Sequence, residues 1–162
     1  MKTILFLLLA ITIHPAFSQT WKKINIDEKV SISKPGETNR VTSGENIEIS
    51  AITASGNLSI ERFTLPDSIE YNDGKIDFLK YYSNGYIKGM EFSGKINKTE
   101  NTSELQIDSG KVRSVLLKGN KENIIQIYFF VIDRKIYSIQ FIENEAPSDS
   151  VRQKIFSSIQ IK

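Results

Sequence analysis

Cysteine and histidine are almost missing from this sequence. No cysteine occurs among its 162 residues, and the single histidine is His14. Imidazole and thiolate groups are the commonest general bases, metal ligands and strong nucleophiles near neutral pH. The chain beyond residue 18 has neither residue, so it cannot carry out Ser-His-Asp or Cys-His catalysis and cannot form a zinc site built on nitrogen or sulfur ligands. A disulfide framework is excluded as well.

Long apolar runs are also scarce, and the clearest one lies at the N-terminus. Lys2 precedes the apolar run Thr3–Ile13, and Pro15 follows it just before small residues that end at Ser18. This order predicts a secretory signal peptide over residues 1–18, cleaved after Ser18. The run is shorter than the roughly 20 residues of a membrane-spanning helix, so we expect no membrane insertion after cleavage. Because the sequence has no lipobox cysteine, we expect the mature chain to be periplasmic or secreted.

A charge excess of either sign is missing too. The chain has 21 basic and 19 acidic residues, and its net charge is +2. The two signs are interspersed along the sequence, so the charge pattern predicts no nucleic-acid partner and no anionic membrane surface. The remaining segment, residues 19–162, has the length of a single domain, which buries roughly 70% of the surface that its unfolded chain exposes.

The first half of this segment alternates apolar and polar residues, as half-buried strands do. Residues 21–35 predict a hairpin that ends at Pro35-Gly36, and residues 37–46 predict a loop or a weak edge strand. Residues 47–63 predict a second hairpin, with Ser55-Gly56-Asn57 at its turn.

A helix is predicted next. Asp73 is the expected N-cap, because its carboxylate can accept hydrogen bonds from the first turn. Gly85 or Gly89 is the expected end, since glycine tolerates the left-handed conformation of a C-cap. The expected inward stripe is Ile76, Leu79, Tyr82 and Tyr86.

The second half predicts a polar loop over residues 97–103 and then an antiparallel meander. Its strands are expected near residues 105–107, 112–117, 124–132 and 135–143. The stretch 124–132 is apolar almost throughout, which is typical of a central strand covered on both faces. A second helix with Ser148 as N-cap should bury Val151, Ile155 and Phe156, and residues 159–161 should form a last strand. The predicted fold class is α+β: an antiparallel sheet of about six to eight strands with two helices packed on it.

The chemistry that remains depends on carboxylates, on Ser-Lys or Tyr-Lys arrangements, or on a hard metal held by oxygen ligands. Asp67, Asn72 and Asp73 are weak candidate metal ligands, although their spacing does not match a calcium loop. Helix capping and solvation are the alternative roles for these three residues. Glu143 and Glu145 could act as an acid and base pair, or could lie in a solvated loop. No cofactor is expected.

An aromatic group falls on the first predicted helix and just after it. Aromatic rings dominate small-molecule sites and protein interfaces. Tyr81, Tyr86 and Phe92 are therefore the candidate recognition surface. Packing in the core is the alternative, and it applies best to Tyr82 and Tyr86 on the inward stripe.

The order of elements resembles the PsbP-like superfamily, which includes DcrB-type periplasmic proteins. The similarity is carried by Trp21 leading into residues 30–35 (VSISKP), and by the ending in which residues 136–139 (IYSI) precede residues 155–161 (IFSSIQI). The resemblance implies a sandwich in which helices pack on an antiparallel sheet. Members of the superfamily serve as assembly factors, small-GTPase binders or envelope proteins, so it also implies a binding role. No catalytic residue can be carried over.

Three functions are compatible with these observations, and the third of them is a calcium-dependent structural protein. The first is an exported, soluble, non-enzymatic binding or assembly module of the cell envelope or extracellular space, whose partner is a protein or an envelope component. The alternative is a carboxylate-dependent hydrolase acting on envelope polysaccharide. Such an enzyme needs a cleft with two carboxyl groups, roughly 5 Å apart if retaining and roughly 6.5 to 9.5 Å apart if inverting.

Overall fold

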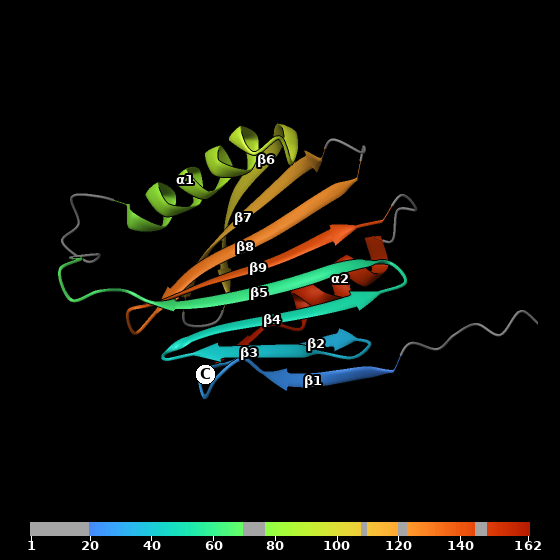
Figure 1. Ribbon diagram of the computed structural model, residues 1–162, viewed down its shortest axis with the longest axis horizontal. Helices are drawn as coiled ribbons and strands as arrows, with labels where there is room; N and C mark the ends of the chain where they lie inside the picture. Colours follow the sequence, from blue (N-terminus) through green and yellow to red (C-terminus); the bar gives the residue numbers. More distant parts are fainter. Residues whose placement is uncertain (1–19, 70–76, 108–109, 120–122, 145–148) are drawn as a thin grey trace, which may run out of the picture.

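The computed structural model describes residues 20–69, 77–107, 110–119, 123–144 and 149–162 (Figure 1). The predicted signal peptide lies outside these residues, and no described helix is long and apolar enough to cross a membrane. The described part confirms the α+β class. Its elements, in chain order, are β1 (Trp21–Asn25), β2 (Val30–Pro35), β3 (Asn39–Ser43), β4 (Asn46–Thr53), β5 (Gly56–Thr64), α1 (Phe78–Phe92), β6 (Ile96–Ile107), β7 (Gly110–Gly119), β8 (Ile124–Ile132), β9 (Lys135–Glu143), α2 (Asp149–Ser157) and β10 (Gln160–Ile161).

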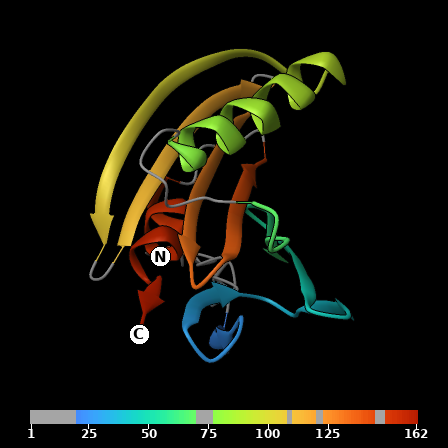
Figure 2. The same ribbon diagram turned by 90° about the vertical axis from the view of Figure 1, so that its left-hand side faces the viewer.

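The strands form two antiparallel sheets. The large sheet has seven strands in the order β3-β4-β5-β9-β8-β7-β6, and the small sheet has three in the order β1-β2-β10. The predicted opening hairpin is therefore confirmed as β1 and β2, the possible edge strand as β3, and the meander as β6 to β9. Figure 2 shows the twist of the large sheet, with α1 and the small sheet at opposite ends of the view.

The main core lies between one face of the large sheet, the small sheet and α2. Strands β4, β5 and β9 contribute every second side chain to it, and α2 contributes Ile155 and Phe156, as predicted. Val151 packs against this core as a partly buried residue. Burial of this apolar surface is the dominant stabilising term of the fold.

Helix α1 lies on the opposite face of the large sheet and covers β6, β7 and β8 (Figure 1). A second core lies beneath it, formed by side chains of α1 and of β7 and β8, with Phe129 fully buried. On this same face, β5, β4 and β3 extend beyond the helix and are not covered by it (Figure 1). We call this region the open face.

Strand β8 was predicted to be central and covered on both sides. Its side chains do enter both cores: Tyr128 and Phe130 face α2, and Ile127 and Phe129 face α1. It lies between β7 and β9, but the middle strand of the seven is β9. The sequence did not show that β3, β4 and β5 would extend the sheet beyond β9. This extension depends on the pairing of β5 with β9, which are far apart in the chain.

Two local predictions were wrong. The turn between β4 and β5 is Ala54-Ser55, and Gly56 is already paired with Thr53. The Thr53 hydroxyl explains this, because it accepts from the Gly56 N–H at 3.0 Å and closes the turn without Asn57. The expected polar loop 97–103 is instead part of β6, which pairs with β7 along its length. An edge strand has one solvated side and tolerates a polar composition.

A buried polar network joins the β1–β2 hairpin to the large sheet. The Asp27 carboxylate accepts from the Tyr137 hydroxyl at 2.5 Å and from Arg62 Nη1 at 3.1 Å, and also from the backbone N–H groups of Lys29 and Val30 at 2.9 Å. Burial raises the pKa of the Asp27 carboxyl, but the hydrogen bonds together hold that pKa below its ordinary value. Asp27 is therefore ionised at neutral pH and forms a salt bridge with Arg62.

Candidate functional site

Helix α1 carries the residues predicted to recognise a partner. Asp77 is its N-cap, with a side-chain oxygen that accepts from the Lys80 N–H at 3.0 Å. The predicted N-cap, Asp73, lies outside the described residues. An aspartate cap satisfies one of the free N–H groups of the first turn and favours a start at residue 78.

The end of α1 differs from the prediction. Neither Gly85 nor Gly89 ends the helix, which continues to Phe92. The stop is Gly94, whose φ of +67° is left-handed. Its N–H donates to the Glu91 carbonyl, and the next N–H, that of Lys95, donates to the Met90 carbonyl at 2.9 Å. This is the Schellman arrangement, in which a left-handed glycine follows the C-cap.

The inward face of α1 is also shifted from the expected stripe. Its buried residues are Leu79, Ser83, Ile87 and Met90. Tyr82 and Tyr86 lie half-buried at the margin of this face, next to the open face of the sheet. Both rings contact Phe129 edge to face, with centroid distances of 6.0 Å and 5.4 Å. These contacts hold the two phenol rings in fixed positions.

The Tyr86 hydroxyl donates to Gln140 Oε1 on β9 at 3.2 Å. Burial and, after it, the negative charge of Glu61 raise the pKa of Tyr86 to about 12. The phenol therefore stays protonated near neutral pH. It can act as a hydrogen-bond donor, but it is a poor base or nucleophile.

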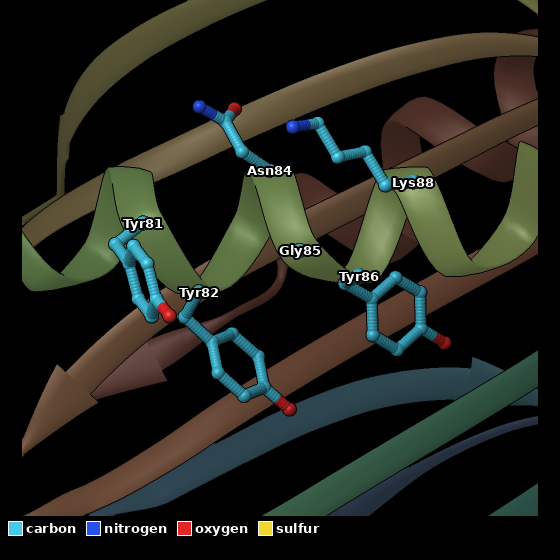
Figure 3. Close-up of a pocket in the computed structure, with 6 residues that line it drawn as sticks. All are labelled: Tyr81, Tyr82, Asn84, Gly85, Tyr86 and Lys88. Atoms are coloured by element: carbon cyan, nitrogen blue, oxygen red, sulfur yellow. The ribbon is translucent and has the colours of Figure 1, made fainter.

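A pocket of about 530 Å³ lies along α1. Tyr81 is 72% exposed at its rim, and Gly85 leaves it open, because a Cβ at that position would meet nothing within 4 Å. Figure 3 shows the three tyrosine rings on one side of the helix, with Asn84 and Lys88 pointing to the other. The lining residues are Tyr81, Tyr82, Asn84, Gly85, Tyr86 and Lys88.

A second pocket, of about 410 Å³, lies between the C-terminal part of α1 and the ends of β8 and β9. It shares Tyr86 with the first pocket, so this ring stands between the two. Amide side chains of Asn123 and Gln140, the Lys95 ammonium group and apolar side chains line it. A few polar groups on an apolar wall are typical of small-ligand sites.

The structure separates the three aromatic candidates. Tyr81 and Tyr86 line the same pocket, whereas Phe92 is 97% exposed at the end of α1 and does not line it. Sequence reasoning missed Gly85 and Gln140 as parts of the site. A glycine within a helical pattern can have a packing or functional role or can end the helix, and the sequence pattern predicts Gly85 as a possible helix end. Gln140 gives no local signal, because only sheet pairing brings it to Tyr86.

The metal candidates gain no support. The Asp67 side chain is fully exposed, and its Oδ1 lies 3.7 Å from Arg134 Nη2. Asn72 and Asp73 lie outside the described residues. Within the described part of the chain, no group of three or more Asp, Glu, His or Cys side chains could hold a metal ion.

Of the two carboxylates expected of a hydrolase, only Glu143 lies among the described residues. Glu143 ends β9 and is buried, not solvated, in an ion pair of 3.4 Å with Arg152 of α2. Glu145 lies outside the described residues. Four pockets formed by described residues contain no lining Asp or Glu. These pockets therefore do not supply the pair of carboxyl groups that glycoside hydrolysis requires.

Comparison with known proteins supports the fold assignment. No family model matches the chain, and no curated protein matches its sequence. Its structure is similar to the solution structure of the cyanobacterial PsbP protein CyanoP from Synechocystis, with a TM-score of 0.60 and 11% identity, over 91% of this chain and 96% of that one. The chain therefore has a PsbP-like fold.

A further solved structure, of a protein from Bacteroides thetaiotaomicron, has a TM-score of 0.46 and 12% identity, over 87% of this chain and 48% of that one. This second likeness is too low to support an argument. The first likeness confirms the PsbP-like architecture that the sequence predicted.

Proposed function

We propose that this protein is an exported, non-enzymatic binding or assembly module of the cell envelope or extracellular space, which recognises a protein or an envelope component through α1. The observation that carries the proposal is the pocket along α1. It combines an exposed tyrosine, two tyrosine rings fixed on Phe129 and an opening at Gly85. Fixed aromatic rings contribute large contact area at low entropic cost, and they are enriched where binding energy concentrates.

The chemistry of the same surface favours binding over catalysis. The Tyr86 phenol is held in its protonated form, since burial and the charge of Glu61 raise its pKa to about 12. A Tyr-Lys mechanism needs the opposite shift, toward a phenolate near neutral pH. Asn84, Lys88 and the tyrosines can instead donate and accept hydrogen bonds at the rim of an apolar surface. The PsbP-like fold supports the same conclusion, because the resemblance implies a binding role.

The pocket can be tested with two matched substitutions in α1. Gly85 and Gly89 are both exposed, and a Cβ at either position meets nothing within 4 Å. Of the two, Gly85 lines the pocket. Gly85→Leu should fill the pocket while leaving the fold intact, and Gly89→Leu is the control with the same change in composition and helix propensity.

The tagged protein, these two variants and Gly85→Ala would be used to capture partners from the envelope of the source cell, with mass spectrometry of what is retained. We expect a component that binds the unchanged protein, Gly85→Ala and Gly89→Leu, but not Gly85→Leu. Its purified form should then bind directly, with affinity reduced about tenfold or more by Gly85→Leu. Equal capture by all variants would overturn the role of the pocket.

Export is tested separately. Cell fractionation and N-terminal sequencing of the purified protein should give a periplasmic or secreted product that begins at Gln19. A cytosolic product that retains the first 18 residues would contradict the proposal.

A further inference from the structure

The two sheets have four outer strands, and three of them carry features that oppose the addition of another strand. Strand β6 has two register shifts against β7, both within residues 96–101. Strand β1 carries the consecutive lysines Lys22 and Lys23, and β10 has two residues. Bulges, lysines and short length are the usual devices by which proteins protect sheet edges from pairing with other chains.

Strand β3 has none of these features. All five of its residues, Asn39–Ser43, are exposed, and none of them is Lys, Pro, Asp or Glu. It pairs with β4 without a register shift. Its charged side chain, that of Arg40, donates to the backbone oxygens of Asn25 at 2.9 Å and Ile26 at 2.8 Å. The guanidinium group is thus held against the β1–β2 hairpin and does not guard the edge.

The hairpin between β3 and β4 decides which backbone groups are free. Its turn is Gly44-Glu45, with a φ of +58° at Gly44, and Ser43 is paired with Asn46. A two-residue turn with a left-handed glycine first is closed by hydrogen bonding between the flanking residues. Along a strand, the backbone N–H and C=O groups of successive residues point alternately to its two sides. Since those of Ser43 point to β4, the N–H and C=O groups of Arg40 and Thr42 point away from β4. Within the described ranges no strand pairs with these groups, and we call them the free edge.

The open face next to this edge is acidic. Val41 is paired with Glu48, and Glu48 is paired with Glu61 on β5, so the three side chains form one row across the sheet. Like charges directly opposite each other are destabilising. Among the described residues, neither glutamate takes part in an ion pair. Burial and the charge of Glu48 raise the pKa of Glu61. A basic side chain placed opposite Val41 would extend the row and relieve this repulsion.

We propose that β3 is a docking edge for an extended segment of a partner protein, which adds to the large sheet as an eighth strand. Backbone hydrogen bonds to Arg40 and Thr42 would hold this segment, as in other cases of strand addition. Lysine or arginine at alternate positions of the segment would lie over the open face, near Glu48 and Glu61. This surface is distinct from the pocket along α1 and goes beyond the proposed function.

The probe is a blocked peptide of about nine residues in which lysine alternates with valine. A peptide in which glutamate replaces lysine tests the charge preference. A lysine peptide with alternate N-methylated amides tests the backbone pairing, because it cannot donate along one edge. Binding to the purified protein is measured by calorimetry at low salt, and its position by chemical-shift changes of backbone amides. We expect the lysine peptide to bind, with the largest shifts at Arg40 and Thr42.

Two pairs of variants separate the backbone and charge contributions. Thr42→Pro removes an outward N–H, which an edge strand tolerates, and Thr42→Val retains it. We expect Thr42→Pro to weaken binding about tenfold and Thr42→Val to leave it unchanged. Glu48→Lys should weaken binding of the lysine peptide and favour the glutamate peptide. Glu91→Lys, an equal charge change on the exposed side of α1, should have little effect.

Several results would overturn the proposal. These are equal binding of the lysine and N-methylated peptides, equal binding by the two Thr42 variants, and shifts that map to α1. A dimer that forms without peptide and is abolished by Thr42→Pro would instead identify a second copy of this chain as the occupant. Gly85→Leu should not affect peptide binding, so the failure of one surface can be told apart from the failure of the other.

Discussion

Replacement of Asp27 by alanine tests whether the buried polar network stabilises the fold. The side chains of Asp27 and Arg62 are 3% and 8% exposed, so water does not screen their interaction. The substitution leaves the Arg62 guanidinium and the Tyr137 hydroxyl without their buried acceptor. Removing one partner of a buried ion pair costs about 3 to 5 kcal/mol. That is a large part of the roughly 5 to 15 kcal/mol by which a domain is stable.

The assay is urea unfolding followed by the fluorescence of Trp21, the sole tryptophan of the chain, and by circular dichroism. Trp21 lies on β1, in the hairpin that the network attaches to the large sheet. Glu37→Ala is the control, because it removes an ion pair with Lys22 in which both side chains are exposed. Such pairs contribute at most about 1 kcal/mol. A cost for Asp27→Ala as small as that of the control would refute the reasoning.

The same network predicts a pH dependence with a defined sign. The pKa of the Asp27 carboxyl is lower in the folded protein than in the unfolded chain. Its contribution is therefore fully present above the unfolded value of about 3.9 and is lost as the pH falls through the folded value. Between about pH 5 and pH 3, the unchanged protein should lose more stability than Asp27→Asn. A parallel loss in both proteins would contradict this assignment.

Three further predictions concern α1 and the β4–β5 hairpin. Gly94→Ala should lower the free energy of unfolding by about 1 to 2 kcal/mol in urea titrations, because alanine is strained at a φ of +67°. Gly56→Ala should cost more than about 2 kcal/mol in the same assay, since its Cβ would collide with the Ile142 carbonyl oxygen. Spectrophotometric titration should show a phenol with a pKa near 12 that disappears in Tyr86→Phe; an unchanged curve would reject the assignment.

Most strands and both helices were predictable from the sequence, because period-two and helical patterns record which side of each element is buried. Ile155 and Phe156 show this for α2. The ends of α1 were not predictable in the same way. Several glycines and aspartates could serve as caps, and packing of the helix on β6 to β8 decided that Asp77 and Gly94 would do so.

The amino-acid composition by itself determined which chemistries are excluded beyond residue 18, because no folding can create an imidazole or a thiol that the chain lacks. Tertiary structure determined which residues lie next to one another in the candidate sites. Gln140 meets Tyr86, and Glu61 lies opposite Glu48, through strand pairing and helix packing between segments that are distant in sequence. The free edge of β3 is also a property of the sheet order, since a strand has an unpaired edge when no neighbour pairs with it.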